Sequence, residues 1–236
     1  MDGMTPKSDL NFECRYCHRQ YVKESTLAAH LCEPKRRWQQ EKEVGVQLGL
    51  RAYIRFYEIT QGSAKFKSYT DFVESPYYKA FVKFGRYLCD IRAVNTASYT
   101  EWLLKNNKKI DHWTKDSMYT EWLLQYLPKE AVSDALERSL NTMVEYAEQN
   151  SDLRNGFSDY FRYGNVNKVC FQISTGRISP WVIYNCDSGQ EFLSQLAEDQ
   201  INIVMPVINP DIWMRRLNDY PADVIWCKET LSKAGL

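Results

Sequence analysis

Apolar residues recur at helical spacing along most of the chain, and strand-like alternation is rare. Residues 37–60 carry a broad apolar face and are predicted to form one long helix. Residues 129–149 repeat apolar side chains with the same period and predict another. The pattern therefore predicts a mostly α fold, in which the helical part forms one domain or two lobes.

A further helix is predicted to begin at Ser75 and Pro76, since serine caps helix N-termini and proline suits the first helical position. One face of this helix is apolar and another is basic. The basic stripe suits contact with a phosphate backbone, with flanking tyrosines stacking on bases, and it equally suits the solvated face of a core helix. The core stripe is Tyr77, Phe81, Phe84 and Leu88, and the basic stripe is Lys79, Lys83 and Arg86, flanked by Tyr78 and Tyr87.

The hexapeptide YTEWLL occurs twice, at residues 99–104 and 119–124. Two copies predict two similar short helices that present Trp and Leu to a common core. Ser98 and Glu101 have the spacing of a capping box for the first helix. The intervening segment KNNKKIDHWTKD is basic and loop-like.

The net charge of zero conceals an asymmetry between the two halves of the 236-residue chain. Residues 1–115 contain 20 Lys and Arg against 13 Asp and Glu, a net charge of +7, and residues 116–236 contain 10 against 17, a net charge of −7. A basic half suits nucleic acid and an acidic half suits a protein partner, although ordinary solvated surface explains both.

Four residues near the N-terminus have the spacing C-x2-C-x12-H-x-C, which is typical of tetrahedral zinc ligands. Three apolar residues between and before them occupy the positions that form the small core of a ββα finger. The segment therefore resembles a C2H2-type zinc finger. The predicted ligands are Cys14, Cys17, His30 and Cys32, and the apolar positions are Phe12, Tyr21 and Leu27.

The fourth ligand departs from the C2H2 pattern, because only Leu31 separates His30 from Cys32. Residues two apart on a helix point in nearly opposite directions, so these two cannot share a metal while both are helical. We expect the helix to end near His30, which lets Cys32 turn back to the metal. His18 is a poor substitute ligand.

The finger is not predicted to read a base sequence by itself. Its base-reading positions, by alignment, are Lys23, Ser25, Thr26 and Ala29, of which only Lys23 is a strong donor. Contact with the nucleic-acid backbone fits better, and docking to a protein or bracing of a neighbouring domain are alternatives. The residues predicted to contact backbone are Arg15, Arg19, Lys23, Lys35, Arg36 and Arg37, together with the basic stripe.

Enzymatic signatures are missing from the sequence. There is no phosphate-binding glycine loop, no dinucleotide fingerprint and no H-E-x-x-H, and His112 has no supporting motif. We therefore predict no catalytic residues and a protein that is not an enzyme. The N-terminus lacks a secretory signal and no apolar run reaches membrane-spanning length, so we expect a cytoplasmic protein with reduced cysteines and no membrane partner.

The strings SPYYKAFVKFGRY, TKDSMYTEWLLQYL and GRISPWVIYNC resemble a family of mostly uncharacterised proteins of T-even-like tailed phages, notably those infecting marine cyanobacteria. That resemblance covers nearly the whole chain and implies no established activity. The stretch ISPWVIYNCDSGQEFLSQL is similar to the second lobe of phage helicase-loading proteins. The latter similarity implies an all-helical, two-lobed protein in the host cytoplasm that binds branched DNA and a single-strand-binding protein.

The expected organisation is a disordered N-terminus (1–11), a zinc finger (12–34), a basic helical lobe (35–150) and an acidic helical C-terminal lobe (151–236). The expected function is that of a zinc-binding, non-enzymatic accessory protein that binds single-stranded or forked DNA, such as a phage helicase loader. Its acidic half would bind a replication or transcription protein. The alternative is a zinc-finger interaction adaptor in phage transcription or host takeover.

Overall fold

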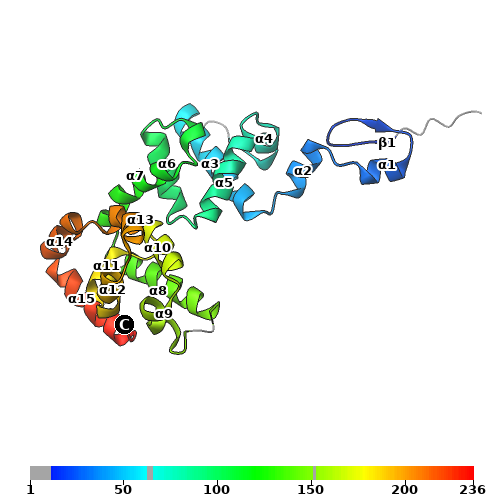
Figure 1. Ribbon diagram of the computed structural model, residues 1–236. Helices are drawn as coiled ribbons and strands as arrows, with labels where there is room; N and C mark the ends of the chain where they lie inside the picture. Colours follow the sequence, from blue (N-terminus) through cyan, green and yellow to red (C-terminus); the bar gives the residue numbers. More distant parts are fainter. Residues whose placement is uncertain (1–11, 63–65, 151–152) are drawn as a thin grey trace, which may run out of the picture. The chain divides into compact units, whose positions relative to one another are not determined.

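The computed structural model describes residues 12–62, 66–150 and 153–236 (Figure 1). The expected disordered N-terminus, residues 1–11, lies outside the described residues. The chain divides into two compact units, Met1–Tyr87 and Leu88–Leu236. The expected boundary between a basic and an acidic lobe, at residues 150 and 151, falls inside the second unit.

The first unit begins with a small ββα finger and continues with four helices, the last of which runs into the second unit. The two strands pair antiparallel, with Phe12 opposite Tyr21 and Glu13 opposite Gln20. The elements are β1 (Phe12–Glu13), β2 (Gln20–Tyr21), α1 (Glu24–Ala29), α2 (Glu33–Gln39), α3 (Val44–Gln61), α4 (Tyr69–Glu74) and α5 (Tyr78–Asp90).

The prediction of one long helix over residues 37–60 is wrong, because the chain leaves helical geometry between α2 and α3. Residues 39–43 are all polar, so this stretch offers no apolar side chain that would hold a continuous helix against the core. Glu43 instead adopts an extended backbone (φ −66°, ψ 130°) before α3. Its carboxylate accepts hydrogen bonds from Nε and Nη2 of Arg86 at 2.7 and 2.8 Å.

The helix predicted from Ser75 and Pro76 exists, but it begins at Tyr78. Ser75 ends α4, and its hydroxyl accepts a hydrogen bond from the backbone N–H of Tyr77 at 3.1 Å. The predicted core position Tyr77 is wrong, since that side chain is 49% exposed and Tyr78 is buried in its place. The extra turn before the helix shifts the phase of the apolar stripe. Phe81, Phe84 and Leu88 are buried as predicted.

Helices α3 and α5 approach each other through glycines. A Cβ added to Gly85 would lie 1.9 Å from the carbonyl oxygen of Gly45 and 2.5 Å from the backbone nitrogen of Gly49. Only glycine permits this separation, because any side chain at the crossing would overlap backbone atoms of the facing helix.

The second unit is entirely helical in its described residues, which confirms the mostly α fold class together with the helices of the first unit. The helix predicted over residues 129–149 is present at Val132–Glu148. Its elements are α6 (Thr96–Lys105), η1 (Ile110–His112), α7 (Asp116–Tyr126), η2 (Leu127–Lys129), α8 (Val132–Glu148), η3 (Gly156–Asp159), α9 (Tyr160–Tyr163), α10 (Val166–Ser174), α11 (Pro180–Asn185), α12 (Asp187–Ser194), α13 (Glu198–Ile208), α14 (Pro210–Asp219) and α15 (Pro221–Lys233).

The two copies of YTEWLL form α6 and α7, as predicted. The rings of Tyr99 and Tyr119 meet edge to face, with centroids 5.2 Å apart, and both are buried. The predicted capping box of α6 is wrong. Asn95 caps this helix instead, with a left-handed backbone (φ 38°), and its side chain accepts a hydrogen bond from the backbone N–H of Ser98.

None of the helices in the described part of the chain combines the length and the apolar character that a membrane span requires.

Candidate metal centre

The finger brings all four predicted ligands to one point. Cys14 follows β1 and Cys17 lies in the turn before β2, while His30 ends α1 and Cys32 begins α2. Their ligand atoms lie within 4.8 Å of one another, and they form the one cluster of three or more potential metal ligands among the described residues.

The separations within the cluster fit a tetrahedral zinc ion. Bonds of about 2.3 Å to sulfur and about 2.0 Å to nitrogen place two thiolates about 3.8 Å apart, and a thiolate about 3.5 Å from an imidazole nitrogen. The sulfurs of Cys14 and Cys32 are 3.9 Å apart, and the sulfur of Cys17 is 3.3 Å from Nε2 of His30. The donor set can therefore hold a metal ion, and three thiolates with one imidazole are a set that zinc takes in structural sites.

The short spacing between the last two ligands is accommodated by ending α1 early, as the sequence predicts. His30 has an extended backbone (φ −68°, ψ 124°) immediately after the last helical residue, Ala29. Cys32 is again extended (φ −87°, ψ 163°) at the start of α2. The chain therefore turns between two helices at Leu31, and both side chains reach the same centre.

Backbone groups of the turn between the strands prepare the first thiol for a metal. The backbone N–H of Tyr16 hydrogen-bonds to the Cys14 sulfur and, against the opposing effect of burial, lowers the pKa of this thiol to about 7. At Cys17 the backbone N–H of Arg19 acts in the same direction, but burial and the neighbouring thiols raise its pKa overall. A bound cation reverses this repulsion, because it stabilises all the thiolates at once.

His18 points away from the cluster and pairs with Glu13 at 2.8 Å, on an exposed surface. Its backbone N–H donates to the carbonyl oxygen of Cys14 at 2.8 Å, and its left-handed backbone (φ 57°) turns the following chain so that the carbonyl oxygen of Arg19 accepts a hydrogen bond from the backbone N–H of Cys14 at 3.0 Å. His18 therefore shapes the turn between the ligands.

The predicted backbone-contacting cations divide into exposed and structurally engaged groups. On the finger itself Arg15, Arg19 and Lys23 are all exposed. The Arg15 and Arg19 guanidinium groups lie over the rings of their neighbours Tyr16 and Tyr21, at 4.7 and 5.8 Å from the ring centroids.

The three cations of α2 differ in role. Arg36 is exposed, whereas Lys35 donates a hydrogen bond to the carbonyl oxygen of the ligand His30 at 2.9 Å. Arg37 donates to the carbonyl oxygen of Val73 at 2.6 Å and lies over the Tyr78 ring at 4.6 Å. Arg37 therefore anchors α2 to α4 and α5.

The basic stripe of α5 is exposed but partly neutralised. Lys79 pairs with Glu33 at 3.2 Å, and Arg86 pairs with Glu43. Hydrogen bonds from Arg37 and then Lys79 lower the pKa of Glu33, and those from Arg86 lower the pKa of Glu43. Of its predicted tyrosine flanks, Tyr78 is buried and only Tyr87 retains partial exposure.

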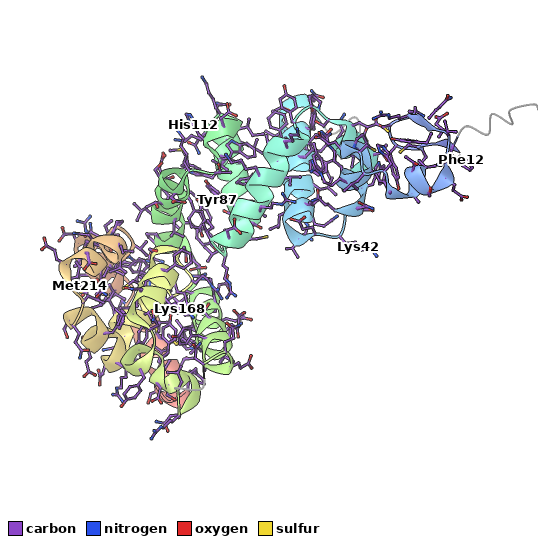
Figure 2. All side chains as sticks on the ribbon, turned by 45° about the vertical axis from the view of Figure 1, so that its right-hand side comes forward. Phe12, Lys42, Tyr87, His112, Lys168 and Met214 are labelled. Carbon is purple, nitrogen blue, oxygen red and sulfur yellow. The ribbon has the colours of Figure 1, made fainter. Side chains whose placement is uncertain are left out.

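His112, the histidine outside the finger, lies on the surface at the end of η1 (Figure 2).

Comparison with known proteins returned no match: no protein-family model, no curated protein and no solved structure resembles the chain closely enough to be counted. The chain is therefore assigned to no family, and its resemblance to phage proteins stays a prediction from its motifs.

Proposed function

We propose that this protein is a zinc-stabilised, non-enzymatic accessory protein that binds nucleic acid through its N-terminal finger. The observation that carries the proposal is the cluster of three thiols and one imidazole in a finger that exposes three cationic side chains. A unit this small has too little core to fold alone, so zinc would supply its folding energy.

Charge supports a polyanionic partner for the finger taken together with α2, since within residues 12–34 alone three cations balance three carboxylates. Between Phe12 and Arg37 the chain has six cationic side chains against three carboxylates, Glu13, Glu24 and Glu33, a net charge of +3 before His is counted. Four of these cations, Arg15, Arg19, Lys23 and Arg36, are exposed. Ala29 and the small hydroxyl side chains of α1 offer few donors to base edges, so we propose contact with backbone phosphates rather than base reading.

The test is binding of the zinc-loaded protein to single-stranded, duplex and forked DNA across a salt series. The variant Arg15→Gln/Arg19→Gln/Lys23→Gln should bind duplex DNA more weakly. The salt slope, which is the slope of the logarithm of the binding constant against the logarithm of the salt concentration, should flatten by roughly 0.9 for each phosphate that the finger no longer neutralises. The matched control is Lys79→Gln/Lys83→Gln/Arg86→Gln. Since two of these three cations are already paired with carboxylates, this variant should retain more of the slope.

Zinc content, measured on every variant, establishes that the metal site is intact. Wild-type affinity and slope in the finger variant would refute contact through the finger. A preference for forks over linear duplex would support the finer proposal of a phage replication factor such as a helicase loader, whose acidic C-terminal half binds a replication or transcription protein.

A second candidate function is that of a protein-docking adaptor. Val22 and Leu31 are 83% and 62% exposed on the finger. An apolar pair of this kind suits a protein surface better than a phosphate backbone. Val22→Ser/Leu31→Ser should abolish capture of a partner that survives nuclease treatment, whereas DNA binding through the cations should be unchanged.

A further inference from the structure

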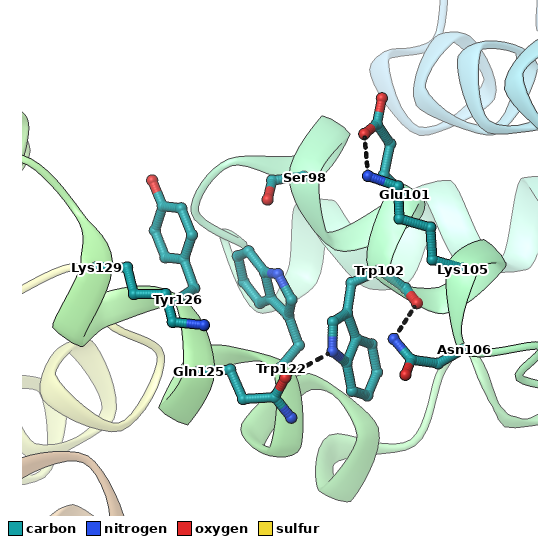
Figure 3. A pocket seen from close by; sticks show the side chains of 9 residues that line it. All are labelled: Ser98, Glu101, Trp102, Lys105, Asn106, Trp122, Gln125, Tyr126 and Lys129. Carbon is teal, nitrogen blue, oxygen red and sulfur yellow. Dashed lines mark hydrogen bonds and ion pairs between the residues drawn. The ribbon is translucent and has the colours of Figure 1, made fainter.

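Helices α6 and α7, which contain the two copies of YTEWLL, line an open pocket of about 260 Å³ in the second unit (Figure 3). Aromatic side chains of α6 and α7 form its walls, and lysines lie at both ends. The side chains used below are Trp102, Trp122, Tyr126, Gln125, Lys105 and Lys129.

The aromatic rings of the pocket are fixed in place by the surrounding structure. Trp122 is 2% exposed and stacks on Tyr126, with ring centroids 4.8 Å apart and an angle of 20° between the rings. The hydroxyl of Tyr126 is held between Asn95 and the buried carboxylate of Glu130, at 3.2 and 3.1 Å. A ring fixed in this way loses little conformational entropy when a ligand stacks on it.

The third ring, Trp102, is also oriented by a hydrogen bond. Its indole N–H donates to the side-chain oxygen of Gln125 at 3.1 Å, which leaves the amide nitrogen of Gln125 as a donor at the rim. In the view of Figure 3, Trp122 lies between Tyr126 and Trp102. The two outer rings are half-buried, so they are the surfaces that a ligand reaches.

The charges at the rim select the ligand. Aromatic walls alone suit a cation, but the lining residues carry a net positive charge: Lys105 pairs with Glu101 at 3.5 Å, and Lys129 adds a second cation. Lys108, which pairs with Glu121 at 3.0 Å, already lies over the Trp102 ring at 5.0 Å and occupies the place of a bound cation there. A cationic ligand would be repelled. A flat ring attached to an anionic group satisfies both the aromatic walls and the lysines.

The chain next to the pocket is basic as well. Residues 105–115 contain four lysines and one acidic residue, Asp111, and Lys105 belongs both to this segment and to the pocket. The local charge is therefore opposite to that of the C-terminal half of the chain, and it suits a phosphate attached to the bound ring.

We propose that this pocket binds an unpaired nucleobase by stacking on Trp102 and Tyr126, with the adjoining phosphate on Lys129, the lining lysine outside the Lys105–Glu101 pair. The volume is just below the range of about 300–1,000 Å³ that is usual for drug-sized ligands, which fits one ring system with its substituents. The base belongs either to a single strand or to a free nucleotide, which share this chemistry. The inference does not rest on the finger, because the pocket is built wholly within the second unit.

The test measures binding of the full zinc-loaded protein to three probes: a labelled twelve-residue oligothymidylate, an abasic sugar-phosphate chain of equal length, and thymidine monophosphate. Trp102→Ala should weaken oligothymidylate binding by about 5- to 150-fold, as expected for the removal of one base–aromatic stack. Trp102→Phe should restore most of the affinity. Binding of the abasic chain should be the same in wild type and Trp102→Ala.

The matched control is Trp226→Ala, which removes another partly exposed tryptophan (44%) far along the chain and should leave affinity unchanged. Lys129→Gln alters an exposed side chain that folding does not need, and it should flatten the salt slope for oligothymidylate by about 0.7. Displacement of the oligomer by thymidine monophosphate, abolished in Trp102→Ala, would support the pocket and identify a free nucleotide as its ligand. Failure of the mononucleotide to compete, with Trp102 still required, would identify the strand.

Equal oligothymidylate affinity in wild type, Trp102→Ala and Lys129→Gln would overturn the inference. Equal loss of abasic-chain and oligothymidylate binding in Trp102→Ala would overturn it too, because stacking needs a base. If Trp102→Ala weakens binding and the triple finger variant does not, the pocket stands and the finger proposal fails. If the triple finger variant weakens binding and Trp102→Ala does not, the finger proposal stands and the pocket inference fails.

Discussion

Glu130 shows how one residue can organise several elements. Its side chain is 2% exposed, lies just after η2, and accepts a hydrogen bond from Nη2 of Arg138 in α8 at 2.7 Å. The same guanidinium donates from Nε to the carbonyl oxygen of Gly176 at 2.9 Å, and the carboxylate also receives the hydroxyl of Tyr126. One buried ion pair therefore connects α7, α8 and the turn after α10.

Replacing Glu130 by Gln should destabilise the second unit by about 2–4 kcal/mol, because the partly buried guanidinium of Arg138 (19% exposed) then lacks its counter-charge. Urea unfolding followed by circular dichroism measures the change. The matched control is Glu191→Gln, whose partner Arg162 lies 3.8 Å away on an exposed surface, and which should cost less than about 1 kcal/mol.

The double variant Glu130→Leu/Arg138→Met separates loss of the pair from loss of shape. It should be more stable than Glu130→Gln, because no unpaired charge remains. A single variant as stable as wild type would show that Arg138 finds another partner when Glu130 is neutral.

At the scale of elements, the sequence predicted several helices but misplaced some of their ends. The helix starts at Ser179 and Asp187 follow local rules, since a cap or a first-turn residue acts within a few positions along the chain. The break before α3 and the start of α5 at Tyr78 depend on partners more than thirty residues away, such as Arg86 for Glu43. The pattern of apolar and polar residues within one segment cannot predict which distant residue will pair with it.

The contrast between local rules and distant partners also separates the two candidate sites, the metal cluster and the aromatic pocket. The metal cluster was predictable residue by residue, because all four side chains lie within nineteen positions and their spacing reflects the turn and helix between them. The repeat predicted that α6 and α7 pack together. It did not predict that Trp122 is buried while its counterpart Trp102 remains half-exposed, because the surrounding residues of the two identical hexapeptides differ.

The crossing of α3 and α5 yields an element-scale prediction. Gly85→Ala should destabilise the first unit by roughly 1–3 kcal/mol, despite the higher helix propensity of alanine, because the new methyl group meets backbone atoms that cannot rotate away. Thermal unfolding gives the measurement. Lys83→Ala, an exposed change on the same helix, should stay within about 0.5 kcal/mol of wild type; a stabilised Gly85→Ala variant would show that the helices separate freely.

At the scale of the whole molecule, the seven cysteines fall into two chemical classes. No disulfide joins any of the seven in the structure, and three of them belong to the metal cluster. Burial raises the pKa of Cys170 and Cys186, and it raises the pKa of Cys227 to about 12, so these thiols resist modification. Cys89 is half-buried.

Removing the metal with a strong chelator should therefore make three additional thiols reactive toward an aromatic disulfide reagent, while the helical circular dichroism of the second unit persists. The expected cause is unfolding of the finger alone, whose core is small. A Cys32→Ser variant is the control, since it should bind zinc more weakly and release two thiols. An unchanged thiol count after chelation would contradict a metal in the cluster.

Helix α2 is fastened at both of its ends. Cys32, the last metal-cluster residue, is also the residue from which α2 starts, and Arg37 and Trp38 at the other end contact Val73 and Tyr69 of α4. This helix of seven residues thus links the metal cluster directly to an aromatic cluster. Loss of the ion would release the first turn of α2, so the fluorescence of the tyrosines in α4 and α5 would report whether the finger holds a metal.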